Sequence, residues 1–571
     1  MAPRKTRERN VGTICDIACG AALCMPLEEP KMGEIADRTR VKWTVVVTLT
    51  VVFLATLYRS GPPRVVPGNA PVEAFSAERA FEHVEVIGAS PHPMGSARNT
   101  EVRDYIVEQL IELGLDPEIL GDGRPPESIL ARVAGKGSGK ALVLMSHYDS
   151  AYGAPGASDA ASCVAAILEA VRAASHMQPL NNDLFILITD GEERGLLGAK
   201  ALARDTALIK SIGIVCNFEA RGHFGPVVMF ETHPKNQWAI GEFSRASSRP
   251  FCSSLTQTIY DAMPNGTDYS VFKDCGVQGL NFAFIGGPLV YHTPNDSVGN
   301  LDLRSLQHHG IYALDLIRHF GNVDLEREPG ESTVHFSLFS KAVIHYPRPW
   351  AVGAGVLLTG CFILLVGGAV GRRRVRFWRV ALSALNFSLT GLAVLGVCEL
   401  AWTQALRSQG LAGFLLEHQG LAVGVLGLVC LALLCLVFWL ARRWLNEVEA
   451  VLGPLAVFLA LLVITVARAP GFSYLFFWPL AAAVPLLVHT AFRNPKLPYT
   501  AWTGPLAALP AIVAIPLKIP LLAPVFAAFP EHSAPSVGTA FLLCGLTAPV
   551  LCRSVAAGEL ASQNAQPLGG A

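Results

Sequence analysis

The apolar residues of this chain follow two different patterns, and the change between them divides the sequence. From about residue 77 to residue 322, short apolar runs of strand length alternate with stretches of helical spacing. From residue 350 onward, long apolar segments follow one another with little between them. About 20 apolar residues are enough to cross a bilayer as a helix. We therefore expect a soluble domain followed by a membrane region.

The alternating segment predicts an α/β domain with a largely parallel central sheet flanked by helices. Its apolar runs predict buried strands, and its amphipathic stretches predict the helices that cover them. The strands are expected at residues 141–145, 184–189, 212–218 and 280–285, and the clearest helices at 104–113 and 160–174.

The membrane region predicts an all-α bundle of about seven spans, which an N-terminal span at 43–59 brings to eight. We interpret that first span as an uncleaved anchor rather than a signal peptide, because no small-x-small site follows it closely. The seventh span is interrupted by prolines and contains Lys518, which we expect to snorkel to an interface; lining a polar cavity is the alternative. The later spans lie at about 350–370, 380–402, 420–441, 450–468, 472–492, 503–528 and 536–556.

Clusters of basic residues follow every second span and predict the orientation of the chain. The positive-inside rule puts these clusters in the cytoplasm together with the basic residues before the first span. Both termini are then cytoplasmic, and the soluble domain lies on the extracytoplasmic face, in the periplasm or a lumen. The basic residues concerned are Arg38, Arg40, Lys42, Arg372, Arg373, Arg374, Arg376, Arg379, Arg442, Arg443, Arg493, Lys496 and Arg553.

These patterns together predict seven regions along the chain of this multi-pass integral membrane protein. They are a cytoplasmic tail (1–42), an anchor (43–59), a linker (60–76), a peptidase-like domain (77–325), a second linker (326–349), the transmembrane domain (350–556) and a cytoplasmic tail (557–571).

Composition agrees with a membrane location. Only 16% of the residues are charged, against about 25% in soluble domains. Lys+Arg and Asp+Glu are both 45, which does not indicate a nucleic-acid partner, and we expect none. The 13 cysteines show no CxxC spacing, which disfavours a zinc finger or a disulfide framework. We expect free buried thiols in the soluble segment, with a Cys252–Cys275 disulfide as the alternative; its cysteines are Cys163, Cys216, Cys252 and Cys275.

Metal-binding side chains follow the predicted strands of the soluble segment. Open α/β sheets bind ligands at the carboxyl ends of their strands. In an extended His147-Tyr-Asp149, both polar side chains lie on one face, so one can bind metal while the other orients it. The other stretches with such side chains are Ser158-Asp159, Glu192-Glu193, Glu219 and Tyr291-His292. Each stretch taken alone is also compatible with a purely structural role, such as a polar strand end or a helix N-cap.

Taken together, these side chains predict a zinc centre. Two imidazoles and three carboxylates suit Zn²⁺, and three carboxylates with one hydroxide balance the charge of two ions per chain. Glu192 is left without a ligand role and is the predicted general base. The predicted ligands are His147, Asp159, Glu193, Glu219 and His292.

These motifs resemble those of family M28 zinc peptidases over about residues 77–322. The eight-span arrangement is similar to the membrane-bound branch with endoplasmic reticulum metallopeptidases and vacuolar membrane proteases. The resemblance implies a zinc-exopeptidase-like fold in which Asp159 bridges two ions and Asp149 orients His147. It pairs His147 with Glu219, and Glu193 with His292. The motifs are His147-x-Asp149, Gly156-x-x-Asp159, Glu192-Glu193, Asn217-x-Glu219 and Tyr291-His292-Thr.

The chain departs from the family pattern at two positions. Glu219 stands where many members have Asp, which puts reach and metal preference in question. Cys163 stands where Gly is common, which we interpret as a packing change. Residues 265–269 lie where the family often has a polar segment lining the cleft, and form a candidate substrate loop.

These motifs and spans together predict a membrane-bound, zinc-dependent exopeptidase that acts on peptides, and specifically an aminopeptidase. Glu192 and Asp149 are its predicted catalytic residues. One alternative is a glutaminyl-cyclase-like acyltransferase on the same fold, which uses one zinc. The other is a membrane scaffold or transporter whose soluble domain is not catalytic. The sequence does not indicate an oligomeric state.

Overall fold

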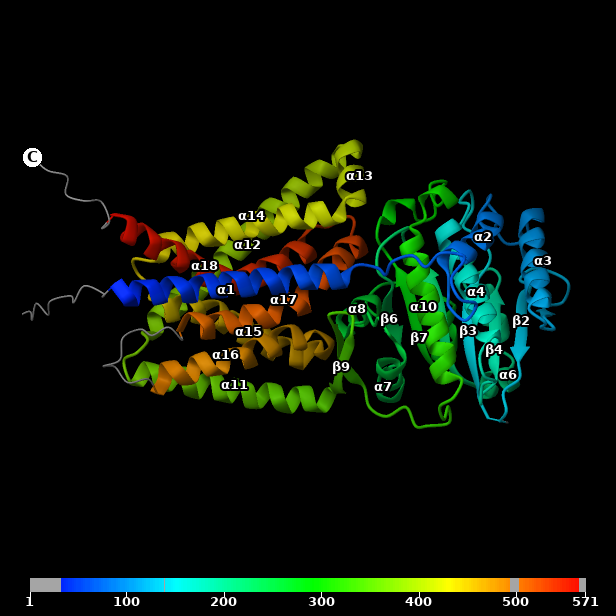
Figure 1. Cartoon of the computed structure of the whole chain (residues 1–571), viewed down its shortest axis with the longest axis horizontal. Coiled ribbons are helices and arrows are strands. Elements are labelled where there is room, and N and C mark those ends of the chain that lie inside the picture. The colour runs from blue at the N-terminus through cyan, green and yellow to red at the C-terminus, as the bar shows by residue number, and fades with distance from the viewer. Residues whose placement is uncertain (1–31, 138, 493–502, 564–571) are drawn as a thin grey trace, which may run out of the picture.

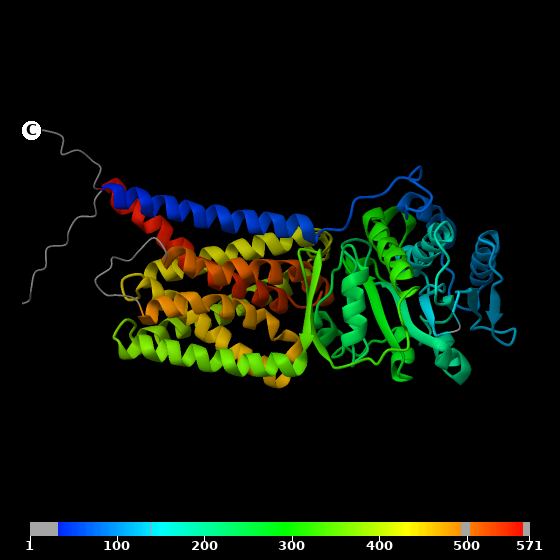
Figure 2. The ribbon, with the colours of Figure 1, turned by 60° about the horizontal axis from the view of Figure 1, so that its bottom comes forward.

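The computed structural model describes residues 32–137, 139–492 and 503–563. It places the soluble domain against one end of a long helical bundle (Figures 1 and 2). The first 31 residues of the expected N-terminal tail and the last eight of the expected C-terminal tail lie outside the described residues. The described part of the C-terminal tail continues helix α18 (Ala534–Gln563).

The domain is built on a seven-stranded sheet in the order β1-β2-β4-β3-β5-β7-β6. Neighbours among β4, β3, β5 and β7 are parallel, and β1, β2 and β6 join antiparallel at the two edges. The four parallel strands are the four that the apolar runs predict, which confirms an α/β fold. The strands are β1 (Glu118–Leu120), β2 (Ser128–Val133), β3 (Ala141–His147), β4 (Leu184–Thr189), β5 (Ile212–Ala220), β6 (Val228–Thr232) and β7 (Gln278–Phe284).

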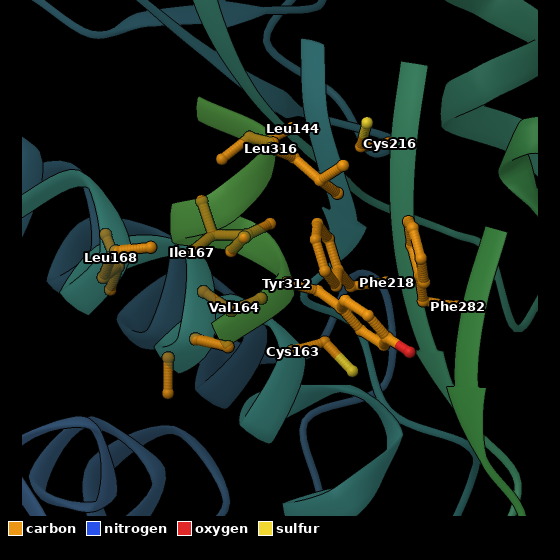
Figure 3. Close-up of a cluster of buried hydrophobic side chains, with 14 of the residues drawn as sticks. Leu144, Cys163, Val164, Ile167, Leu168, Cys216, Phe218, Phe282, Tyr312 and Leu316 are labelled. Atoms are coloured by element: carbon orange, nitrogen blue, oxygen red, sulfur yellow. The ribbon is translucent and has the colours of Figure 1, made fainter. Parts of the chain in front are cut away.

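Helices cover both faces of the sheet, which explains why the central strands are apolar on both sides. Alternate side chains of β3 point to opposite faces: Leu142 and Leu144 join one core, and Val143 and Met145 join another. Figure 3 shows the first core, where strand side chains meet α4 and α10. The helices are α2 (Ala77–Ile87), α3 (Ala97–Glu112), α4 (Cys163–Ser175), α7 (Gln237–Ala246) and α10 (Leu303–Phe320), with α5 (Leu197–Leu202), α6 (Thr206–Ser211) and α9 (Asp268–Asp274) on the second side.

The bundle contains eight helices that are long and apolar enough to cross a membrane, among the residues described. The protein is therefore an integral membrane protein. The spans agree with those expected, and a further short helix, α13 (Gln409–Glu417), lies between two of them. The spanning helices are α1 (Met32–Ser60), α11 (Arg348–Gly371), α12 (Phe377–Arg407), α14 (Gln419–Ala441), α15 (Glu447–Arg468), α16 (Tyr474–Phe492), α17 (Thr503–Ala528) and α18.

Lys518 is buried inside the bundle, so the prediction that it snorkels to an interface is wrong. Its Nζ lies 5.2 Å from the ring centre of Phe458 and 5.0 Å from that of Phe476. Only 1% of Lys518 is exposed. Helix α17 continues through its prolines and carries Lys518 among α15 and α16, where aromatic faces receive the ammonium group.

The segment 326–349, expected to be a linker, forms a β-hairpin of β8 (Thr333–Leu338) and β9 (Ala342–Pro347). This hairpin docks the domain onto the bundle, because Phe336 stacks on Tyr474 of α16 with 4.5 Å between ring centres. Ser253 and Tyr474 share a hydrogen bond of 2.7 Å between their hydroxyls. The Ser254 hydroxyl donates to the Gly471 carbonyl at 2.9 Å. Domain and bundle are thus joined by both apolar and polar contacts.

The four cysteines of the soluble segment are free, as expected. Cys163, Cys216 and Cys252 are buried, but Cys275 is exposed, so the expectation of a fourth buried thiol is wrong. Cys275 caps the C-terminal end of α9, where the chain turns at the surface.

Candidate metal centre

The candidate site lies at the carboxyl ends of the central parallel strands. His147 is the last residue of β3, and Glu219 is the last but one of β5. Glu192 and Glu193 follow β4, and His292 follows the short turn η2 (Pro288–Val290) after β7. Parallel strands end at the same edge of the sheet, so four segments distant in sequence converge there.

All five predicted metal ligands come together at this edge, in two groups that share Asp159. In the first, His147 Nε2 lies 3.2 Å from Asp159 Oδ1 and 3.5 Å from Glu219 Oε2. In the second, His292 Nε2 lies 3.4 Å from Asp159 Oδ2 and 2.9 Å from Glu193 Oε2. Each oxygen of Asp159 therefore faces a different histidine.

Asp159 is positioned by a carboxylate that the sequence analysis did not single out, that of Asp296. The backbone N–H of Ser158 donates to Asp296 Oδ1 at 2.7 Å, and that of Asp159 donates to Oδ2 at 3.1 Å. The turn before them needs glycine: Gly156 has φ of 68°, and a Cβ there would lie 2.7 Å from the Asp159 carbonyl. The one signal of Asp296 in the sequence is its place in the same loop as His292.

Asp149 connects the ends of β3 and β4. Its Oδ1 lies 3.4 Å from His147 Nδ1, which also lies 2.9 Å from the Asp149 carbonyl. Its two carboxylate oxygens accept the backbone N–H groups of Glu192 at 3.0 Å and Glu193 at 3.2 Å. One carboxylate thus orients an imidazole and the loop that carries two glutamates. The tight loop uses Gly191, whose φ is 76°.

The carboxylates of the site favour the protonated form of its two histidines, whose pKa values are raised. Burial alone would lower the pKa of His147, but hydrogen bonds to Asp149, Asp159 and Glu219 raise it well above its usual value. For His292, burial acts the same way, and Asp159 and Glu193 raise its pKa to about 9. Burial raises the pKa of Glu193 to about 7. A cation bound here would take the place of these protons.

Glu192 lines a cavity next to the cluster, together with Asp159 and Glu219. Burial raises its pKa well above the usual value for Glu; His147 opposes this shift, while Glu219, Asp268 and Asp159 add to it. A carboxylate with a raised pKa is a better proton acceptor near neutral pH. Glu192 is thus a buried acid beside the cluster with a raised pKa.

The donor set fits a metal. One ligand atom each from His147, Asp159 and Glu193 lie within 4.8 Å of one another. Glu193 Oε1 is buried without a hydrogen-bond partner among the described residues. The His292 ring is held by Tyr291, which stacks on it with 3.7 Å between ring centres. Imidazole nitrogens and carboxylate oxygens in this arrangement suit Zn²⁺.

The candidate substrate loop is divided by the structure. Asn265, Gly266 and Thr267 line the cavity beside Glu192. Asp268 and Tyr269 instead point into the domain and are buried. Asp268 accepts a hydrogen bond from the Thr189 hydroxyl, and burial raises its pKa to about 7. Asp268 is a second acidic residue near the site whose position depends on the tertiary fold.

Comparison with known families matches residues 128–317 to Peptidase family M28. Endoplasmic reticulum metallopeptidase 1 of Rattus norvegicus is 26% identical over 428 residues, which cover 67% of this chain and 47% of the relative. A vacuolar membrane protease of Candida albicans is 30% identical over 275 residues, covering 46% and 32%. The chain thus spans less than half the length of these curated relatives.

Among solved structures, BSAP, a zinc aminopeptidase from Bacillus subtilis, is 15% identical with a TM-score of 0.37. The match covers 45% of this chain and 98% of that one. A glutaminyl cyclase from an Acidobacteriales bacterium is 19% identical with a TM-score of 0.36, covering 45% and 98%.

Proposed function

We propose that this chain, an integral membrane protein with a peptidase family M28 domain, is a zinc-dependent aminopeptidase that uses two metal ions. The observation that carries the proposal is the pair of ligand groups that share Asp159, with Glu192 lining the same cavity as Asp159. A non-catalytic scaffold, which is the alternative, would not need both of these ligand groups.

Each ion has a set of residues that would hold it. His147, Asp159 and Glu219 would bind one, and His292, Asp159 and Glu193 would bind the other. Glu219 Oε2 lies 3.5 Å from His147 Nε2, so the reach of this longer carboxylate side chain is compatible with the role. When bound, the ions supply Lewis-acid polarisation of the substrate carbonyl and acidify the attacking water.

Two residues of the chain carry the remaining steps. Glu192 would accept the proton of the attacking water and donate it to the amine that leaves. Asp149 is a positioning residue, because it acts through the ring of His147 and the backbone of Glu192 and Glu193. Its hydrogen bond to Nδ1 keeps Nε2 of His147 free to bind metal.

The proposal is tested on the full-length protein in detergent, stripped with a chelator and reloaded with Zn²⁺. Metal content per chain is measured alongside hydrolysis of Leu-Gly-Gly, of its N-acetylated form and of its C-terminal amide. We expect activity to require zinc, saturate near two ions per chain, tolerate the amide and fail with the acetylated peptide. Hydrolysis of the acetylated peptide at the same rate contradicts aminopeptidase activity. Conversion of an N-terminal Gln peptide with one zinc bound would favour the cyclase.

A further inference from the structure

A transmembrane helix forms part of the cavity that Glu192 lines. The cavity is lined by Asp159, Glu192 and Glu219 of the site. It is also lined by three residues of the domain-side end of α17: Pro524, Val525 and Ala528. The space is ≈ 910 Å³, including the part open to solvent.

The rest of the cavity lining is mainly apolar. The only carboxylates among the lining residues are those of the site, and the only cation is Arg221. A side chain that enters here exchanges water for apolar surface, at about 25 cal/mol per Å² buried. A basic side chain would find no separate acidic partner. The apolar wall consists of Val228, Phe230, Ile259, Met263, Ala283 and Ile285.

One face of α17 is turned toward the domain over several turns. Pro516, Pro520 and Pro524 recur every four residues and so lie on one side of the helix. A second cavity runs along this side and shares Pro524, Val228 and Thr256 with the first. The side of α17 that continues to Val525 and Ala528 is therefore a surface of the substrate cavity rather than a lipid-facing surface.

The position of this wall is set by the docking of the bundle. The stack of Phe336 on Tyr474 and the hydrogen bonds of Ser253 and Ser254 hold α8 (Ser254–Tyr260) and β8 against the bundle. Ile259 and Tyr260 of that same α8 line the cavity. The site and the membrane helix are thus parts of one packed unit.

We propose that α17 determines the substrate specificity of this enzyme. Val525 and Ala528 of this helix line the pocket that binds the substrate side chain next to the scissile bond. This pocket takes large apolar side chains such as Leu, Met or Phe. The inference rests on the proposed peptidase function, because the proposed metal cluster, three of whose neighbours or ligands line the same cavity, would carry out the reaction. Selectivity then depends on a residue within the membrane bundle.

The test compares Val525→Trp with Val513→Trp in the full-length protein. Val513 is also on α17, is half-buried and lines neither cavity. The kcat/KM values for Leu-Gly-Gly and Ala-Gly-Gly are measured for each, with zinc content and Tm as checks on folding. We expect Val525→Trp to lower the Leu:Ala ratio by about tenfold or more, as pockets that discriminate side chains by size do. Val513→Trp should keep the wild-type ratio.

A second variant covers the case in which the tryptophan disturbs folding. Val525→Ala enlarges the pocket and should raise the Phe-Gly-Gly to Ala-Gly-Gly ratio with zinc content unchanged. The inference is overturned if neither Val525 variant changes these ratios, or if Val513→Trp changes them equally. Those outcomes leave the peptidase function intact. If the zinc-loaded wild type hydrolysed none of these peptides, the proposed peptidase function itself would be refuted.

Discussion

Asp159 presents each of its two carboxylate oxygens to a different histidine, 3.2 Å from His147 and 3.4 Å from His292. That arrangement suits a ligand shared between two cations, because one carboxylate can bridge ions about 3.5–4 Å apart. Asp296 makes it rigid by accepting the N–H groups of Ser158 and Asp159. At the scale of single residues, the chemistry therefore depends on a few buried acids with separate tasks.

Glu192→Gln should separate metal binding from turnover. The amide keeps the shape of the side chain but cannot accept a proton, so we expect zinc content to stay and kcat to fall by about 10²–10⁴-fold. Glu193→Gln is the comparison, since it removes a proposed ligand and should lower zinc content as well. Metal analysis and Leu-Gly-Gly hydrolysis are measured on both. Unchanged turnover in Glu192→Gln would refute its role as the base.

The buried His308 should make the folded protein less stable in acid. It is buried, accepts the Val227 N–H at 3.0 Å, and burial lowers its pKa to about 4. The unfolded chain has the usual His pKa of about 6.5 and binds more protons between these values. Stability is therefore full above pH 6.5 and falls toward pH 4, by up to about 1.4 kcal/mol per pH unit.

The variant His308→Gln removes this titration while leaving a hydrogen-bond acceptor. Its Tm should fall less than that of the wild type between pH 7 and pH 4. The matched control is His176→Gln at an exposed position, which should follow the wild-type curve. A parallel pH dependence in wild type and His308→Gln would show that another group is responsible.

At the scale of elements, the site depends on how strand ends are connected. The Asp149 carboxylate connects the loops that follow β3 and β4, because it contacts both His147 and the backbone of the Glu192–Glu193 pair. The ligand from the β7 loop is less enclosed, since 39% of the His292 side chain is exposed. The cluster is thus rigid on the sheet side and more open on the loop side.

Asp149→Asn should weaken zinc binding without unfolding the domain. The amide removes the charge beside His147 and offers one acceptor oxygen where two N–H groups need acceptors. Substitutions of residues that orient metal ligands typically lower metal affinity by about 10–100-fold, and we expect a loss of that size. Zinc affinity is measured by competition with a chelator.

Asp205→Asn is the matched control for this variant. Asp205 also accepts two backbone N–H groups, from Ala207 and Leu208, but at the start of α6 and away from the site. It should keep wild-type zinc affinity. Equal losses in the two variants would mean that Asp149 has only a structural role.

At the scale of the whole molecule, the domain lies at one end of the bundle, and the basic clusters among the described residues lie at the other. The arginines after α11 and α14 are at the end away from the domain (Figure 1). Arg372 lies over the ring of Phe492 at 5.0 Å, which brings the ends of α11 and α16 together. This separation supports the proposed orientation, with the domain on the extracytoplasmic side.

Cys275 gives a direct test of that orientation. It is exposed on the domain, whereas Cys163, Cys216 and Cys252 are buried. A membrane-impermeant maleimide applied to intact cells, or to the luminal side of sealed vesicles, should label the wild type and not Cys275→Ser. Cys163→Ser is the control and should label like the wild type. Labelling of Cys275 only after the cytoplasmic side is opened would reverse the topology.

Local sequence patterns were enough to predict the separation of an α/β domain from a helical bundle, the four parallel strands, the membrane spans and the metal-binding side chains that the fold brings together. Each of these follows from local pattern, because an apolar run reports burial and a polar residue after a buried strand must lie at the edge of the sheet. His147, for example, could be placed at a strand end without knowledge of its neighbours.

The distant residues that support and enclose the site could be identified only from the folded chain. Asp296 beneath Asp159, the hairpin that docks on Tyr474, Lys518 between two aromatic rings and Val525 in the cavity wall all depend on contacts between separate segments. A local pattern reports whether a side chain is buried, but not what it is buried against. For that reason α17 could be identified as a membrane span from its sequence, while its place beside Glu192 could not.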